Sequence, residues 1–231
     1  MTISNRIRGI TFDAAGTLFF PTPSVGAIYS EVMARFGLNL EPAQLEYSFR
    51  NVFKSATKDL SIGDPEMRER EFWRSVVTQI IEELAEIPND LEDLFDALWL
   101  EFASGSRWKL NPDAPAIFDF LENRGISFAL LTNWDRRVRQ VVCDHRLDSK
   151  FSHLFISSEA GFEKPDRRFF DLAAAKMKLF PQELLHIGDH HKQDFLGARN
   201  SGWNALLLAV NHDSDPSANR IKSLYEIQDL L

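Results

Sequence analysis

The chain has 231 residues, 44% hydrophobic and 26% charged, so it is long enough for a domain with an insertion and too apolar to be disordered. Its net charge of −8, without a basic patch, argues against a nucleic-acid partner. A single cysteine, Cys143, excludes an internal disulfide and a cysteine-rich zinc site. No uncharged apolar run reaches the length of about 18 residues that spans a membrane, and no apolar signal segment precedes residue 9, so we expect a cytoplasmic protein.

The first expected element is a short buried strand at residues 9–12, which is apolar and contains β-branched residues. Four stripes of apolar residues with helical spacing follow over residues 20–104. The first stripe runs from Val25 to Phe36, and Gly37 is placed to end its helix as a C-cap. No strand is expected between these helices, so this segment reads as a helical insertion.

From Ser104 onward, strands and helices alternate. We expect strands at 127–132, 154–157, 184–187 and 205–210, and helices at 113–124, around 138–142, at 166–178 and at 192–200. A polar loop at 211–219 precedes a last short helix through Leu224 and Ile227. This alternation predicts an α/β fold with a parallel sheet that helices cover on both faces.

The expected domains are a core of residues 1–19 and 105–231 and a helical insertion of residues 20–104. An insertion directly after the first strand leaves the sheet at its carboxyl edge. Ligands of open α/β sheets bind at that edge, so the insertion is placed to act as a lid.

Polar side chains occur at or just after the ends of four expected strands. In chain order they are Asp13, then Thr132 and Asn133, then Lys164, then Asp189 and Asp194. Each has an ordinary structural explanation taken alone, as a turn residue, a helix cap or a solvated loop residue. Because the carboxyl ends of parallel strands share one edge, the set together favours a functional site.

The residue types in this set suit attack by a carboxylate on a phosphorus or carbon centre. An aspartate can act as a nucleophile and form a covalent intermediate. Carboxylates hold Mg²⁺ through oxygen ligands and leave positions for water and substrate. A lysine offsets the excess negative charge, and Thr132 and Asn133 can donate hydrogen bonds to phosphoryl oxygens.

Four segments carry a resemblance to the haloacid dehalogenase-like hydrolase superfamily: ITFDAAGTL, LLTNW, EKPD with the preceding SSEAG, and IGDHHKQDFLGARNSG. The resemblance covers nearly the whole chain and implies a Rossmann-like core with an inserted α-helical cap. It also implies roles for individual residues: Asp13 as the nucleophile, Thr132 as the phosphate-binding hydroxyl, Lys164 as the charge-balancing lysine, and Asp189 and Asp194 as the acidic metal-binding motif.

The sequence departs from the family pattern at Ala15. Phosphatases of the family usually carry a second aspartate there, which protonates the leaving group and then activates water. Alanine can do neither, and general acid–base catalysis contributes about 10²–10⁴ in rate. The implied Mg²⁺ site would not suffer, because the family uses the backbone carbonyl at this position, and Ala15 retains it.

Three functions are compatible with this set. The favoured one is a Mg²⁺-dependent phosphatase of a small phosphorylated metabolite, working through an aspartyl-phosphate without the usual acid. The second is a hydrolase of another bond, either carbon–halogen or carbon–phosphorus. The phosphonoacetaldehyde hydrolases of the superfamily carry a similar Asp-x-Ala-Gly-Thr motif and need a cap lysine, for which Lys54 and Lys58 are candidates. The third is a catalytically impaired binding protein. Neither the substrate nor the oligomeric state follows from the sequence.

Overall fold

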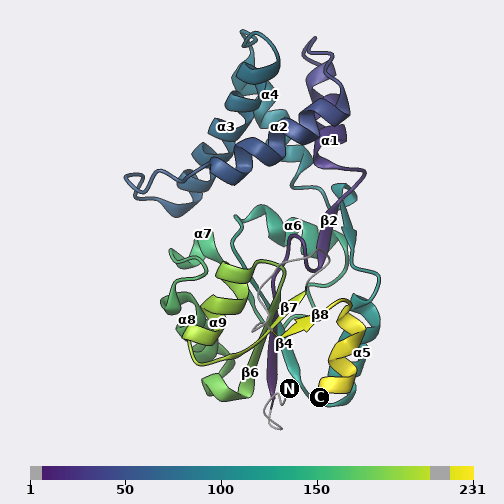
Figure 1. The fold of residues 1–231 in the computed structure, drawn as a ribbon, viewed down its shortest axis with the longest axis vertical. Helices are drawn as coiled ribbons and strands as arrows, with labels where there is room; N and C mark the ends of the chain where they lie inside the picture. Colours follow the sequence, from purple (N-terminus) through teal and green to yellow (C-terminus); the bar gives the residue numbers. More distant parts are fainter. Residues whose placement is uncertain (1–6, 209–218) are drawn as a thin grey trace. The chain divides into compact units, whose positions relative to one another are not determined.

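The computed structural model describes residues 7–208 and 219–231. The chain divides into two compact units, which we call the core unit and the helical unit (Figure 1). The core unit comprises Met1–Phe20, Leu110–Asp135 and Arg146–Leu231, and the helical unit comprises Pro21–Lys109 and Arg136–His145. None of the helices in the described residues is both long and apolar enough to cross a membrane.

The core unit is built on a six-stranded sheet, in the order β5-β4-β1-β6-β7-β8 across the described residues. All five pairs of neighbouring strands are parallel. This confirms the predicted α/β fold with a parallel sheet. The strands are β1 Gly9–Phe12, β4 Ser127–Thr132, β5 Leu154–Ile156, β6 Leu184–Gly188, β7 Asn204–Leu208 and β8 Arg220–Ile221. Residues 209–210 of the last predicted strand, and residues 211–218 of the predicted loop, lie outside the described residues.

Strand β1 occupies the point where the strand order reverses. The chain passes from β1 to β4 and β5 on one side, then returns to β6, β7 and β8 on the other. Phe12 at the end of β1 pairs with Leu130 of β4 and with Ile187 of β6. The residues at or just after the ends of these strands therefore lie at one edge of the sheet: Asp13 after β1, Thr132 at the end of β4 and Asp189 after β6. This edge includes the switch point, where such folds bind ligands.

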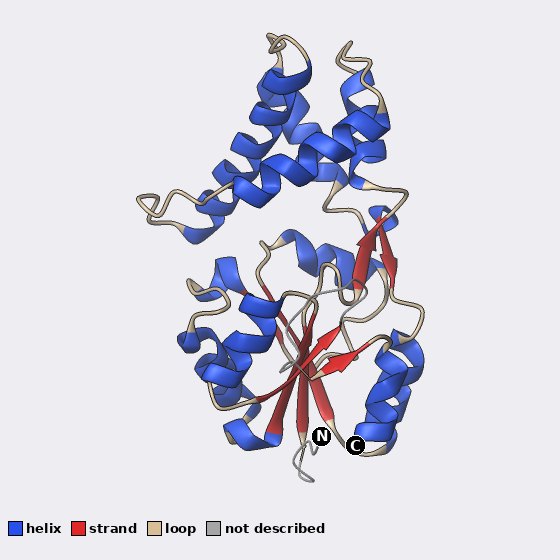
Figure 2. Cartoon of the chain, viewed as in Figure 1, coloured by secondary structure: helices blue, strands red, loops and turns tan. Residues whose placement is uncertain are grey.

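Helices lie on both sides of the strands in the core unit, as Figure 2 shows. On one face, α5 Ala114–Asn123 places Phe118 in a stack on Phe128 of β4, with ring centroids 4.9 Å apart. On the other face, α8 Arg167–Met177 and α9 Gly197–Asn200 bury Phe169, Phe170 and Ala198 in one cluster with β4 and β7 residues. Burial on both faces explains why the strands read as continuous apolar runs. The short helices α7 Ser157–Ala160 and α10 Ile227–Leu230 complete the unit.

The helical unit contains the four helices that the apolar stripes predict: α1 Val25–Ala34, α2 Pro42–Ser55, α3 Pro65–Leu84 and α4 Leu91–Glu101. Their apolar faces share one core, which includes Leu45, Ile80 and Leu94. Gly37 has a positive φ of +79° just beyond α1, as a C-cap glycine requires. The structure also contains a small two-stranded sheet that was not predicted from the sequence, formed by β2 Phe19–Pro21 and β3 Trp108–Leu110.

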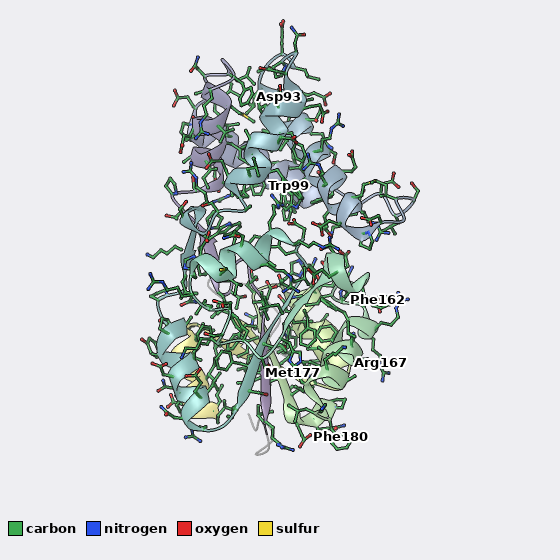
Figure 3. The ribbon with its side chains drawn as sticks, turned by 180° about the vertical axis from the view of Figure 1, so that it is seen from behind. Asp93, Trp99, Phe162, Arg167, Met177 and Phe180 are labelled. Carbon is green, nitrogen blue, oxygen red and sulfur yellow. The ribbon has the colours of Figure 1, made fainter. Side chains whose placement is uncertain are left out.

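One helix of the alternating region, α6 Arg137–Asp144, belongs to the helical unit by its contacts. The Arg137 guanidinium lies 3.4 Å from the ring centroid of Trp99 on α4, which is labelled in Figure 3. The Asp144 carboxylate accepts a hydrogen bond from the Gly105 N–H at 2.7 Å. The predicted domain boundaries placed this helix in the core, and the division into hydrolase core and cap stays a prediction.

Candidate active site

Lys164 lies at the centre of the candidate site, in the loop between α7 and α8. Its ammonium donates hydrogen bonds to Asp13 Oδ1 at 2.8 Å and to Asp194 Oδ1 at 2.6 Å. The lysine side chain is 1% exposed. Burial by itself would lower the pKa of Lys164, but the carboxylates of Asp13 and Asp194 outweigh it and raise that pKa. The lysine therefore stays charged and holds the Asp13 carboxylate at the end of β1.

Asp194 uses both of its oxygens on neighbouring groups. It lies in a π-helical segment, His191–Leu196, that follows β6. Besides Lys164, its Oδ1 contacts His186 Nε2 at 3.1 Å, and its Oδ2 accepts the His190 main-chain N–H at 2.8 Å. Burial alone would raise the pKa of Asp194, but the Lys164 charge and the His186 hydrogen bond hold it below its usual range. Asp194 is thus a buried, ionised anchor.

Asp189 lies against the turn that follows Asp13. The Thr17 hydroxyl donates to Asp189 Oδ1 at 3.4 Å. Gly16 has a φ of +87°, and a Cβ on it would lie 2.4 Å from Asp189 Oδ2, so this position requires glycine. Loss of hydration, followed by repulsion from Asp13 and Asp194, raises the pKa of Asp189 to about 7. Because the residue as a whole is exposed, a cation can reach this carboxylate from solvent.

The position of Asn133 suggests that its side chain binds phosphoryl oxygens, but that side chain hydrogen-bonds to the main chain of Lys164. Its Nδ2 donates to the Lys164 carbonyl at 2.8 Å, and its Oδ1 accepts the Lys164 main-chain N–H at 2.7 Å. The side chain therefore fixes the lysine loop to the end of β4. The second Nδ2 hydrogen is directed to Gln193 Oε1 at 3.4 Å, so the main-chain N–H is the Asn133 donor that we assign to a substrate. Thr132, at the end of β4, is 2% exposed, and its role as a phosphoryl ligand stays a prediction.

The turn after Asp13 leaves the Ala15 carbonyl available. The Leu18 and Phe19 N–H groups both donate to the Ala14 carbonyl at 2.8 Å, and the Gly16 N–H donates to the Phe19 carbonyl at 3.0 Å. Among the main-chain hydrogen bonds described for this turn, none ends on the Ala15 carbonyl. Ala15 is also exposed, so its position has room for a larger side chain.

The donor set fits a hard divalent cation. Asp13, Asp189 and Asp194 each offer a carboxylate oxygen, and these oxygens lie within 4.8 Å of one another. Two oxygens bound to one Mg²⁺ at about 2.1 Å each can be at most about 4.2 Å apart, so a small movement or a bridging water would complete such a site. Three carboxylates around one ammonium leave excess negative charge, and repulsion from Asp13 and Asp194 adds to the loss of hydration that raises the pKa of Asp189. Oxygen donors of this kind suit Mg²⁺ better than a transition metal.

The two lysines considered for Schiff-base chemistry lie in the helical unit. Lys54 is exposed on α2. Lys58 pairs with Glu69 of α3, with Lys58 Nζ and Glu69 Oε1 2.5 Å apart. A Schiff base requires a neutral amine, whereas a neighbouring carboxylate stabilises the charged ammonium. This pairing gives the carbon–phosphorus reading no support.

His186 was not predicted from the sequence as part of the site; its side chain is fully buried in β6 and contacts Asp194. A signal for it is visible in the sequence. The strand LLHIG has a titratable residue at a position flanked by leucine and isoleucine, and a buried polar side chain needs a partner.

Replacing Lys164 with methionine should lower the free energy of unfolding by about 3–5 kcal/mol, because it leaves buried carboxylates without their counter-charge. Urea denaturation at pH 7 measures this loss. The control is Lys176→Met on the exposed face of α8, which should change stability by less than about 0.5 kcal/mol. Equal stabilities for the two variants would show that Lys164 does not balance the site's charge.

Comparisons with known proteins identify the family of this chain. A family model described as haloacid dehalogenase-like hydrolase matches residues 7–202. The haloacid dehalogenase-like hydrolase domain-containing protein 3 of Xenopus laevis is 29% identical over 208 residues, covering 87% of this chain and 84% of that protein. A putative uncharacterized hydrolase of Schizosaccharomyces pombe is 29% identical over 212 residues, covering 87% and 90%.

Among solved structures, the putative HAD-hydrolase YfnB from Bacillus subtilis, bound to magnesium, has a similar fold. Its TM-score is 0.76 at 17% sequence identity, covering 98% of this chain and 99% of that one. A hydrolase from Geobacter sulfurreducens gives a TM-score of 0.73 at 19% identity, covering 100% of both chains. With the family match over residues 7–202 and a parallel sheet whose switch-point strand is followed directly by Asp13, the chain belongs to the haloacid dehalogenase-like hydrolases.

Proposed function

We propose that this hydrolase is a Mg²⁺-dependent phosphatase that acts on a small phosphorylated metabolite through an aspartyl-phosphate on Asp13. The observation that carries the proposal is the placement of Asp13. Its carboxylate ends the switch-point strand, and Lys164 holds its Oδ1 at 2.8 Å. Among the described residues, the hydrogen bond given for the Asp13 carboxylate ends on Oδ1, so we assign Oδ2 as the attacking oxygen.

In the first step, Asp13 Oδ2 forms a bond to phosphorus while the bond from phosphorus to the leaving oxygen breaks. Water then hydrolyses the acyl phosphate, which releases inorganic phosphate and restores the carboxylate. Lys164 offsets the negative charge of Asp13 and of the approaching phosphoryl group. The Thr132 hydroxyl and the Asn133 main-chain N–H are the groups we assign to the phosphoryl oxygens, as the ends of neighbouring strands allow.

The residues that would hold Mg²⁺ are Asp13, Asp189 and Asp194, together with the Ala15 carbonyl. Oδ1 of Asp194 accepts from Lys164 and His186, and Oδ2 accepts the His190 N–H, which leaves at most one lone pair on Oδ2. Asp194 would therefore bind the ion directly through Oδ2 or through a water molecule. The ion stabilises negative charge on the phosphoryl oxygens when bound. We assign the helical unit the role of a cap that selects the substrate, and the single cysteine and acidic charge suit a cytoplasmic enzyme.

The test is a screen of phosphate monoesters, phosphonoacetaldehyde and haloacids with and without Mg²⁺. We expect release of inorganic phosphate from at least one monoester, loss of that release in EDTA, and recovery when Mg²⁺ is restored. Turnover that persists in EDTA contradicts the metal assignment. Cleavage of phosphonoacetaldehyde that requires Lys54 or Lys58 would replace the proposal, and binding of phosphate esters without any turnover would favour a binding protein.

A further inference from the structure

We infer that His186 is a positioning residue: through Asp194 it holds the Lys164 ammonium in place against the Asp13 carboxylate. The inference rests on the proposed function, because it concerns the charge balance of the nucleophile. It does not assign His186 any contact with substrate.

Four side chains form a continuous buried chain of hydrogen bonds that ends on Lys164. Thr11 Oγ1 of β1 and His186 Nδ1 of β6 are 2.8 Å apart. His186 Nε2 and Asp194 Oδ1 are 3.1 Å apart, and the same Oδ1 accepts from Lys164 at 2.6 Å. Thr11 and His186 are both 0% exposed. The chain therefore runs from the middle of the sheet to the nucleophile's lysine.

The chemistry of the partners sets the direction of each hydrogen bond. Asp194 is ionised and can only accept, so His186 Nε2 must carry the proton that it donates. Burial, followed by the charge of Lys164, lowers the pKa of His186 and favours the neutral ring. Nδ1 then accepts from the Thr11 hydroxyl, and the threonine fixes which tautomer is present.

The ring is packed against an aromatic neighbour as well as hydrogen-bonded at both nitrogens. Phe170 of α8 meets the His186 imidazole edge-on, with ring centroids 5.7 Å apart. A buried imidazole is costly unless its nitrogens have partners, and here both nitrogens have one. Thr11 and His186 pair across β1 and β6 in the sheet register, so the backbone brings them together.

The consequence for Lys164 follows from competition at one oxygen. His186 and Lys164 both donate to Asp194 Oδ1. The hydrogen bond from His186 partly compensates the negative charge of Asp194. Asp194 then attracts Lys164 less strongly, and the ammonium interacts more strongly with Asp13. Without that donor, Asp194 attracts the ammonium more strongly, and the bond from Lys164 to Asp13 weakens.

Two variants of His186 separate this role from simple packing. His186→Gln keeps an amide donor and an acceptor at about the spacing of the ring nitrogens, whereas His186→Phe keeps the ring shape and removes both. We expect His186→Phe to lower kcat by about 10–100-fold, as loss of an outer-shell partner does. We expect its KM and its affinity for Mg²⁺ to stay within about threefold, and His186→Gln to retain most of the activity.

The matched control is Phe170→Leu, which disturbs the packing beside the same ring without removing a hydrogen bond. It should lower stability while kcat stays near that of the unmodified enzyme. The inference fails if His186→Phe turns over normally, or if the Gln and Phe variants lose activity equally in proportion to their loss of folded protein.

A second measurement does not depend on activity. In ¹⁵N-labelled protein, His186 should show a protonated Nε2 and an unprotonated Nδ1, and the buried Lys164 ammonium should give a slowly exchanging signal. His186→Phe should shift that ammonium signal, and His186→Gln should leave it nearly unchanged. If the unmodified protein hydrolyses no ester, the proposed function fails, and these spectra alone decide the inference. The inference is wrong if His186 carries its proton on Nδ1 and not on Nε2, or if the Lys164 ammonium signal does not shift in His186→Phe.

Discussion

Replacing Asp13 with asparagine should reduce phosphate release by about 10⁴–10⁶-fold, the range seen when a hydrolase loses one member of a catalytic triad. Asparagine has nearly the same shape, and its amide oxygen can still accept the Lys164 hydrogen bond, so the fold should survive. The amide nitrogen cannot attack phosphorus. Steady-state kinetics measures the loss. An acid quench during turnover should trap phosphate on the unmodified protein, in a form that hydroxylamine releases, and none on Asp13→Asn.

The control is Asp171→Asn, an equally conservative change on the exposed face of α8. It should leave turnover unchanged. If Asp13→Asn retains more than about a tenth of the activity, which corresponds to less than about 1.4 kcal/mol of transition-state stabilisation, another group is the nucleophile. If phosphate is trapped on the Asp13→Asn protein as well, the covalent step does not use Asp13.

Replacing Ala15 with aspartate should raise turnover on alkyl phosphates by up to about 10²–10⁴-fold, the contribution of a positioned acid–base group. Ala15 is exposed, so a carboxyl group can fit there. In the proposed mechanism, Asp13, Lys164 and the acidic cluster would form the acyl phosphate, and the natural protein would lack a side chain at residue 15 to protonate the leaving oxygen. Activity of the natural protein should therefore depend steeply on leaving-group pKa, with aryl phosphates cleaved faster than alkyl ones.

Ala15→Asn supplies the matched control, because it has the shape of aspartate without its acidity. The ratio of kcat/KM for an aryl phosphate to that for an alkyl phosphate should fall in Ala15→Asp and stay unchanged in Ala15→Asn. Equal rates on the two substrates by the natural protein would mean that another group already supplies the proton. A gain in the asparagine variant would point to binding instead of proton transfer.

The sequence predicted the parts of the fold whose signals are local. Strands 9–12 and 127–132 and the four helices of the helical unit appear where apolar periodicity placed them. Short elements without periodicity escaped: β8 has two residues, and β2 has three, including Pro21. The predicted helix at 192–200 begins instead as a π-helical segment in which Asp194 hydrogen-bonds back to residue 190 through its backbone and side chain.

The sequence predicted which charged residues cluster in the candidate site, but it did not predict most of the hydrogen-bond partners of these residues. Because parallel strands share an edge, their ends predicted that Asp13, Lys164, Asp189 and Asp194 lie close together, and the structure brings these four residues together. The place of Thr132 in the site stays a prediction. The use of Asn133 to clamp Lys164 depends on a contact across 31 residues of chain. The pairing of Thr11 with His186 spans 175 residues and requires the strand order to be known. Periodicity carries no information about either contact.

Positions beside the acidic cluster differ in whether they have room for a side chain. Gly16 faces the Asp189 carboxylate, and a Cβ on Gly188 would lie 2.2 Å from Asp194 Cγ, so any side chain at either glycine displaces an acidic group. Ala15, which precedes Gly16 and is open to solvent, carries no such constraint. A lineage could therefore gain or lose proton transfer through changes at one codon while the charge framework stays intact, and new substrate preferences could arise without rebuilding the site.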